Sequence, residues 1–182
     1  MGEYKTDTVA SNMKPLMKSG LSRKARLLYD EICNYGYDIY YVPAHFGYYG
    51  VNNAFEYSKL ITKEGNKETF YQKIFVDMGV THPFTILHYK DNNGYEYSRK
   101  SKFVVISTGA IKIWNKFHNQ KYGMVLTLSH ELAHIRLFED KFLKAQHYYN
   151  YFEDPHNLRF QEVYTNICNE YNIKYTDESY LD

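Results

Sequence analysis

This chain has few cysteines, no long apolar run and almost no net charge, and each of these absences excludes a class of protein. Its two cysteines, Cys33 and Cys168, form no C-x-x-C pair, which excludes a separate zinc ribbon and favours two buried thiols over a disulfide. No run is long enough to span a membrane, and residues 1–20 lack the apolar stretch of a signal peptide, so we expect an intracellular, cytoplasmic protein. A net charge of +1 gives no case for nucleic-acid binding.

The length and composition indicate one globular domain. The chain has 182 residues, of which 44% are apolar and 24% charged, which suits a single ordinary core. Tyrosine is abundant, with 21 residues against one tryptophan, and we interpret this as drift in composition because Tyr can replace Phe in a core. Residues 1–20 are polar and broken by Pro15 and Gly20, so we predict a flexible N-terminal arm followed by one domain over 21–182.

The order of the predicted elements indicates an α+β fold. Apolar residues at helical spacing predict a first helix, stopped by Gly36, and a short helix before two longer ones; these helices cover 21–35, 110–117, about 124–138 and 155 to about 171. Strands are predicted at 37–42, 70–77, 84–90, 95–97 and 102–107, with irregular chain over 43–68 and a turn at 91–94. Together they predict a small mixed sheet with the helices packed against it.

A metal-binding motif lies inside the apolar run from 124 to 138. Residues 127–134 read T-L-S-H-E-L-A-H and contain H-E-x-x-H. On a helix, His130 and His134 lie on one face and can hold one zinc ion together, while Glu131 can act as general base toward a zinc-bound water. The apolar surroundings predict a buried helix, and a metal supplies the partners that buried histidines need.

The spacing leaves the third ligand open. The metzincin pattern fails, because Leu137 and Asp140 stand where it needs Gly and His. His156 and Glu162 are the candidates, and His147 is a weaker one because its tyrosine-rich segment has no helix start or stop signal. Three further histidines are assigned no role at the metal, namely His45, His82 and His88.

Helix periodicity favours His156 over Glu162. Asp154 and Pro155 predict a helix start, with Asp as N-cap and Pro in the first turn. At about 100° per residue, His156 continues an apolar stripe, whereas Glu162 falls on the polar face. Glu162 stays open as a ligand because Asn166, four residues later, could hydrogen-bond a ligand histidine.

These motifs resemble the SprT-like (Spartan-type) zinc metallopeptidases. In that family a third histidine opens the helix after H-E-x-x-H, with an aromatic residue four positions later, as His156 and Phe160 do here. The resemblance covers 102–171 and implies a zincin-like fold, Zn²⁺ bound by His130, His134 and His156, and an endopeptidase acting on protein substrates with Glu131 as its base. A nucleic-acid partner is implied only by the family's role in repairing DNA–protein crosslinks.

Several features depart from this family and keep alternatives open. The 21 residues between His134 and His156 exceed the usual gap, Asn157 replaces a common Gly, and no C-terminal zinc ribbon follows. The ImmA/IrrE-type peptidases are a second resemblance, in which Glu162 would be the ligand and a repressor the substrate. A third hypothesis is a binding protein with a zincin fold and a structural metal, which would not need Glu131. For a peptidase, we predict that the substrate pairs with residues 102–107 as an exposed edge strand.

Overall fold

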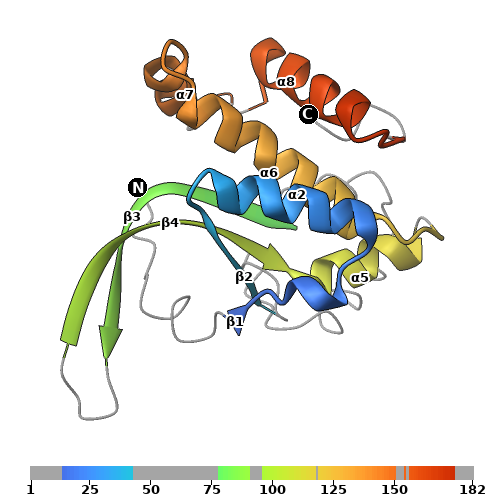
Figure 1. Cartoon of the computed structure of the whole chain (residues 1–182), viewed down its shortest axis with the longest axis horizontal. Helices are drawn as coiled ribbons and strands as arrows, with labels where there is room; N and C mark the ends of the chain where they lie inside the picture. Colours follow the sequence, from blue (N-terminus) through green and yellow to red (C-terminus); the bar gives the residue numbers. More distant parts are fainter. Residues whose placement is uncertain are drawn as a thin grey trace, which may run out of the picture.

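In the part of the chain that the structure describes, a four-stranded mixed sheet and a set of helices form an α+β fold (Figure 1). The computed structural model describes residues 14–42, 78–90, 96–117, 119–150, 154 and 156–174. The strands are β1 (Lys14–Pro15), β2 (Asp38–Val42), β3 (Gly79–Lys90) and β4 (Glu96–Ser107). The helices are η1 (Lys18–Gly20), α2 (Arg23–Asn34), α5 (Thr108–Phe117), α6 (Gly123–Glu139), α7 (Lys144–Asn150) and α8 (Leu158–Glu170).

The sheet has the order β1-β2-β4-β3, so β4 lies between two other strands. β2 runs parallel to β4, with Asp38 opposite Phe103 and Val42 opposite Ser107, while β3 runs antiparallel to β4. The prediction of residues 102–107 as an edge strand is therefore wrong. Its continuous apolar run is the signature of a strand covered on both faces, and Phe103, Val104, Val105 and Ile106 are all buried.

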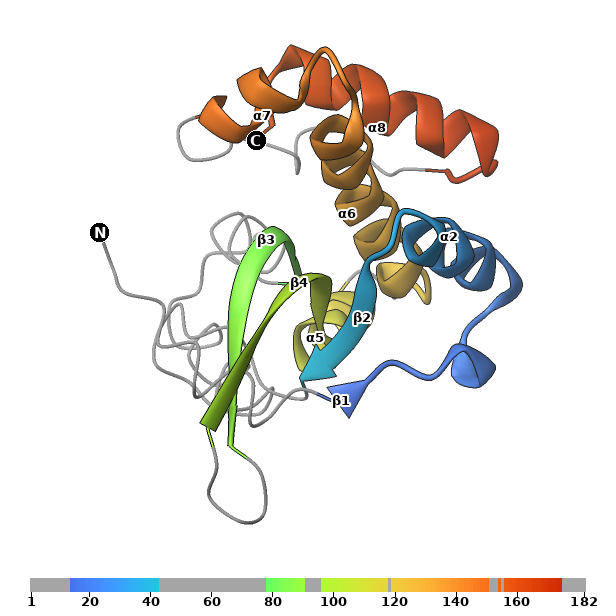
Figure 2. The same cartoon turned by 60° about the vertical axis from the view of Figure 1, so that its left-hand side comes forward.

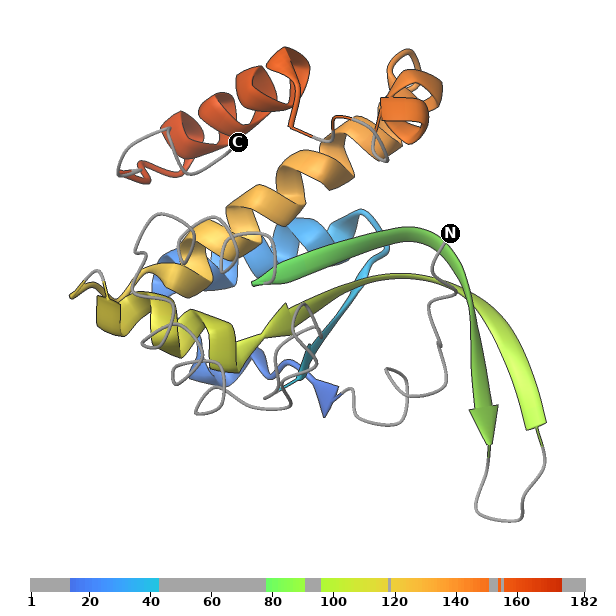
Figure 3. The same cartoon turned by 180° about the vertical axis from the view of Figure 1, so that it is seen from behind.

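Among the described residues, β3 forms one edge of the sheet. Its pairing with β4 contains a bulge between His82 and Thr85, where β3 has one residue more than β4. Pro83 lies in this bulge, and an edge strand tolerates a proline there because the position does not require an N–H donor. β2 pairs with β4 only from Phe103 onward. The part of β4 before Phe103 pairs with β3 alone among the described strands, and these two strands project away from the helices (Figure 3).

Helix α6 is the centre of the structure and lies between the sheet and α8 (Figure 2). It contacts α2, α5, α7, α8 and β3. A helix that is surrounded in this way must be apolar on all sides, and nearly all of α6 is buried. Two of its buried hydroxyls are satisfied within the helix, because Thr127 donates to the Gly123 carbonyl at 2.7 Å and Ser129 to the Leu126 carbonyl at 2.8 Å.

Arg136 joins three helices on one side of α6. Its guanidinium donates to Glu170 of α8 through two bonds of 3.0 and 2.6 Å, and to Glu31 of α2 at 2.8 Å. Tyr171, directly after α8, also donates to Glu31. These paired charges keep α2 and α8 in register with the helix that carries H-E-x-x-H.

The chain before α2 is part of the folded domain from residue 14 onward. Lys14 and Pro15 pair with β2, and the buried Leu16 donates its backbone N–H to the Ile39 carbonyl at 2.9 Å. Tyr29 of α2 donates its hydroxyl to the Leu16 carbonyl. The predicted flexible arm is therefore wrong for residues 14–20, while residues 1–13 lie outside the described residues.

Most predicted helices and strands that fall on described residues are confirmed. The helices predicted at 21–35, 110–117 and 124–138 correspond to α2, α5 and α6, and the strand at 37–42 to β2. The strand predicted at 84–90 begins earlier, at Gly79, and those at 95–97 and 102–107 are one strand, β4. The strand at 70–77, the turn at 91–94 and the irregular segment with His45 lie outside the described residues.

The structure bears on two sequence predictions, that of two buried thiols and that of no membrane-spanning run. Both cysteines are free thiols, but only Cys168 is buried; Cys33 is exposed because α2 turns the adjacent Ile32, and not Cys33, toward the core. Within the part of the chain that the structure describes, no helix has the length and apolar character needed to cross a membrane.

Candidate metal centre

His130 and His134 lie on one face of α6, one helical turn apart. Both are buried, with 7% and 3% of their surface exposed, and their ring centroids are 5.0 Å apart. The continuous apolar run around them places this turn of α6 in the interior. The helix therefore presents two imidazoles side by side in the interior of the protein.

His156 joins this pair from the turn before α8. Its Nε2 atom lies 3.0 Å from Nε2 of His130, and its ring centroid is 5.3 Å from that of His134. The ligand nitrogens of the three histidines all lie within 4.8 Å of one another. Gln161 of α8 donates its amide to the His156 carbonyl at 3.3 Å, which holds the turn against the helix.

The predicted start of the last helix at Asp154 and Pro155 is wrong. Helix α8 begins at Leu158, and its N-cap is Asn157, whose side chain accepts from the backbone N–H groups of Arg159 and Phe160. An asparagine is as good an N-cap as an aspartate, and the N-cap lies three residues later than the predicted one. His156 therefore reaches the site from the turn and not from the helix face on which its selection was based.

Phe160 packs against all three histidines. Its ring centroid is 4.9 Å from that of His130, 4.4 Å from that of His134 and 4.8 Å from that of His156. Tyr164, one turn further along α8, stacks on Phe160 with an interplanar angle of 8°. The first turns of α8 thus form an aromatic wall that fixes the orientation of the imidazole rings.

Burial favours the neutral form of the histidines. It is the main cause that lowers the pKa of His130 and of His134 well below the ordinary value, and the neighbouring His156 lowers both further. Neutral imidazoles carry the free lone pair that a metal ligand requires. Three such rings with converging nitrogens are a donor set for a metal ion.

One of the nitrogen separations also fits a metal ion. Two metal–nitrogen bonds of about 2.0–2.1 Å at a tetrahedral angle place the nitrogens about 3.3 Å apart. The 3.0 Å between His130 Nε2 and His156 Nε2 is close to this value. His130, His134 and His156 could therefore hold a metal ion together.

Glu131 is held on the other side of α6, against β3. Its Oε2 atom accepts a 2.6 Å hydrogen bond from the hydroxyl of Thr81, and its side chain is buried. Burial raises the pKa of the Glu131 carboxyl to about 7, although the Thr81 hydrogen bond acts in the opposite direction. A carboxyl group with a pKa near neutrality is suited to accept and return a proton.

Glu162, the alternative third ligand, does not join the three histidines. It is exposed on α8 and accepts a 2.7 Å hydrogen bond from the guanidinium of Arg159, three residues earlier. His147 is close to the centre but does not belong to the converging group: its Nε2 lies 3.3 Å from Nδ1 of His134. His82 and His88 both lie on β3.

The sequence does not identify Thr81 or Gly79, and it indicates His147 only as a weaker candidate ligand. Thr81 lies 50 positions before Glu131, and no motif links the two. His147 lies in a segment without helix signals, yet Asp140 forms the turn that leads into α7, because its side chain accepts from the backbone N–H groups of Phe142 and Leu143. This local aspartate-centred turn is a recognisable signal that could have located α7.

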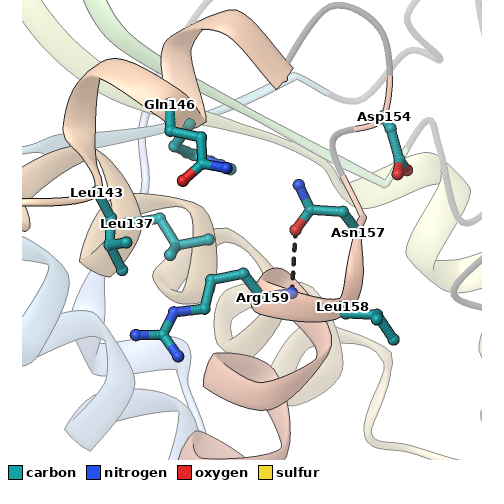
Figure 4. A pocket seen from close by; sticks show the side chains of 8 residues that line it. Leu137, Leu143, Gln146, Asp154, Asn157, Leu158 and Arg159 are labelled. Atoms are coloured by element: carbon teal, nitrogen blue, oxygen red, sulfur yellow. Dashed lines mark hydrogen bonds between the residues drawn. The ribbon is translucent and has the colours of Figure 1, made fainter.

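A pocket of about 380 Å³ opens beside the centre, between the end of α6, α7 and the start of α8 (Figure 4). Gln146 and Asn157 face each other across it, and Leu137 lies at its base. The pocket's lining residues are Leu137, Leu143, Gln146, His147, Asp154, Asn157, Leu158 and Arg159. The pocket is lined by His147 but by none of the three converging histidines.

No protein-family model, no curated protein and no solved structure matches this chain. The functional assignment therefore rests on the geometry of the site and on its chemistry.

Proposed function

We propose that the protein is a zinc-dependent metalloendopeptidase, with His130, His134 and His156 as the ligands of Zn²⁺. The observation that carries the proposal is the convergence of these three imidazoles, two of them buried, at a helix that also buries the carboxyl group of Glu131. An all-nitrogen set of three ligands is typical of zinc and leaves one position of a tetrahedral ion free. A catalytic site needs that free position, whereas a structural site fills it.

The protein's own groups can be assigned distinct roles. When bound, Zn²⁺ would polarise the carbonyl group of the scissile peptide bond and lower the pKa of water. Glu131 would accept a proton from the attacking water and pass it to the leaving amine. Thr81 would hold the Glu131 carboxylate in place, and Phe160 would keep the ligand rings in position.

The edge strand β3 is the best-placed binding surface for a peptide. Gly79 and Thr81 of β3 lie directly against Glu131, so the edge of the sheet runs past the proposed general base. An extended peptide can add itself to such an edge through main-chain hydrogen bonds. Such pairing would bring a peptide bond of a protein substrate next to the centre. Strand β3 thus replaces residues 102–107 as the proposed docking strand.

The ImmA/IrrE-type alternative predicts a different ligand set and has less support. It requires Glu162 at the metal, and Glu162 is instead exposed and paired with Arg159. A binding protein with a structural metal would explain the three histidines but not the buried carboxyl group of Glu131, which follows His130 in the chain. We therefore place both below the endopeptidase.

Zinc loading combined with a protease assay tests the proposal. The full chain is stripped of metal, reloaded with Zn²⁺ and incubated with a denatured protein such as casein, alongside the stripped protein. We expect about one zinc ion per chain, cleavage by the loaded protein, loss of cleavage on stripping and recovery on reloading. A chain that binds no zinc, or cleavage that is equal with and without metal, contradicts the proposal.

A further inference from the structure

His147 is buried although it belongs to a short helix whose preceding residues are exposed. Only 4% of its surface is accessible, while Lys144, Ala145 and Gln146 are exposed. Its ring lies against Phe138 at a centroid distance of 4.5 Å, and it stacks on His134 at 5.5 Å with an interplanar angle of 25°. Helix α7 therefore directs one imidazole at the back of a proposed metal ligand.

The backbone holds His147 in this place. Helix α6 ends at Glu139, and Asp140 accepts the backbone N–H groups of Phe142 at 2.8 Å and Leu143 at 2.9 Å, which turns the chain back on itself. The N–H of His147 then donates to the Leu143 carbonyl at 2.8 Å. The contact with His134 is thus built from a capped turn and a regular helix.

If His134 binds a metal, the contact between the two imidazoles determines which nitrogen of His134 carries the proton. A neutral imidazole has one N–H group and one lone pair. Nδ1 of His134 lies 3.3 Å from Nε2 of His147, so Nε2 of His134 is the nitrogen left to bind a metal. If His147 donated to Nδ1, the His134 proton would have to be on Nε2, and the ring could not bind. Ligation therefore requires His134 to donate and His147 to accept.

We propose that His147 is a positioning residue of the metal centre, which accepts the Nδ1 proton of His134 and so holds the His134 ring with Nε2 toward His130 and His156. Metal-ligating histidines commonly donate their second N–H to a carboxylate, a backbone carbonyl or water. Here a neutral side chain from α7 takes that role. This inference rests on the proposed function, because it assumes that His134 is a ligand.

Two other roles for His147 fit the geometry less well. A fourth ligand would have to share the space where the other nitrogens converge, but Nε2 of His147 faces the opposite nitrogen of His134. A purely packing role would be served equally by an aromatic ring without an acceptor, such as phenylalanine. The comparison of His147→Gln with His147→Phe separates packing from hydrogen bonding, because the glutamine carbonyl can stand in for Nε2.

The test is the zinc affinity of the full chain, measured by competition with a chromophoric chelator. We expect His147→Phe to bind zinc about 10- to 100-fold more weakly than wild type. His147→Gln should recover most of this loss, and Gln146→Ala, the exposed neighbour, should match wild type. Thermal unfolding of the metal-free proteins shows whether the Phe and Gln variants are equally folded.

A second measurement needs no variant. In ¹⁵N-histidine NMR spectra of the zinc-loaded wild type, we expect His134 to be protonated at Nδ1 and metal-bound at Nε2, with His147 unbound. Three results overturn the inference and leave the proposed function standing. They are equal zinc affinity of the Phe and Gln variants, an unprotonated Nδ1 on His134, and direct coordination of zinc by His147. Failure of the wild type to bind zinc overturns both.

Discussion

Gly79 of β3 lies against the carboxyl group of Glu131 on α6. A Cβ atom at position 79 would be 2.8 Å from Oε1 of Glu131 and 2.8 Å from the methyl group of Thr127. Both neighbours are held in place, because Thr81 donates to Glu131 and the Thr127 hydroxyl donates to the Gly123 carbonyl. The strand therefore approaches the helix at a distance that only glycine allows.

The first prediction concerns this close approach. Gly79→Ala should destabilise the protein by about 1–3 kcal/mol, because the added methyl group overpacks a site whose neighbours cannot move freely. It should also lower peptidase activity by displacing Glu131. The measurement is denaturant unfolding, with Gly20→Ala as control, since a Cβ at Gly20 meets nothing within 4 Å. Equal stabilities of the two variants would show that β3 is not packed so closely.

The second prediction concerns the hydrogen bond to the carboxyl group. Thr81→Val keeps the shape of the side chain but removes the donor to Glu131 Oε2. We expect zinc content to stay unchanged while kcat/KM falls by about 10- to 100-fold, as is usual when a supporting hydrogen bond is lost. Thr81→Ser retains a hydroxyl and should recover much of the activity. A Thr81→Val variant as active as wild type would contradict the proposed role of Thr81 in holding the Glu131 carboxylate.

The third prediction separates the two candidates for the third ligand. His156→Ala removes a nitrogen that lies 3.0 Å from Nε2 of His130, so zinc affinity should fall by at least about 100-fold. Glu162→Ala removes an exposed carboxylate paired with Arg159 and should leave zinc affinity unchanged. Chelator competition measures both. Loss of zinc from the Glu162 variant, with retention in the His156 variant, would favour the ImmA/IrrE-type ligand set.

The fourth prediction is a dependence of stability on pH. Burial raises the pKa of the Glu139 carboxyl, but hydrogen bonds from Lys102 at 2.9 Å and Tyr37 at 3.0 Å outweigh it, so the net pKa is lowered. A lowered pKa contributes stability that is present above the unfolded-state pKa of about 4.3 and is lost as the pH falls through the folded-state pKa. Glu139→Gln should therefore cost about 1 kcal/mol or less near pH 7.

The size of that effect should change with pH in one direction. The difference in unfolding free energy between wild type and Glu139→Gln should shrink as the pH is lowered from 6 to about 3, where the carboxyl group is protonated in both states. Urea unfolding at a series of pH values measures it. A difference that grows toward low pH contradicts the assigned ion pair.

The parts of the fold with a strong local pattern could be predicted from sequence. The apolar run around His130 predicted the position and the burial of α6, and the apolar residues 103–106, three of them β-branched, predicted the end of β4. The polar first half of β4 has no such pattern, so its continuity with residues 102–107 was not recognised. The prediction of residues 102–107 as an edge strand is also wrong, because sequence does not state which strands are neighbours.

The candidate site was predictable only where its residues share a motif. His130, Glu131 and His134 are four positions apart or fewer, so one helix fixes their relationship. His156 was selected on a helix face to which it does not belong, since Asn157 and not Asp154 caps α8. Thr81 and Gly79 reach Glu131 through contacts between segments that are distant in the sequence, which no local pattern records.

The comparison of wild type with Glu131→Gln tests the central claim most directly. Both proteins are loaded with Zn²⁺, their zinc content is measured, and the rate at which they cleave the same peptide is compared, with Glu162→Gln as a matched carboxylate control. We predict equal zinc content in all three, full activity in the Glu162 variant, and a loss of about 10²- to 10⁴-fold in the Glu131 variant because the general base is absent. Cleavage by Glu131→Gln at the wild-type rate would contradict the account.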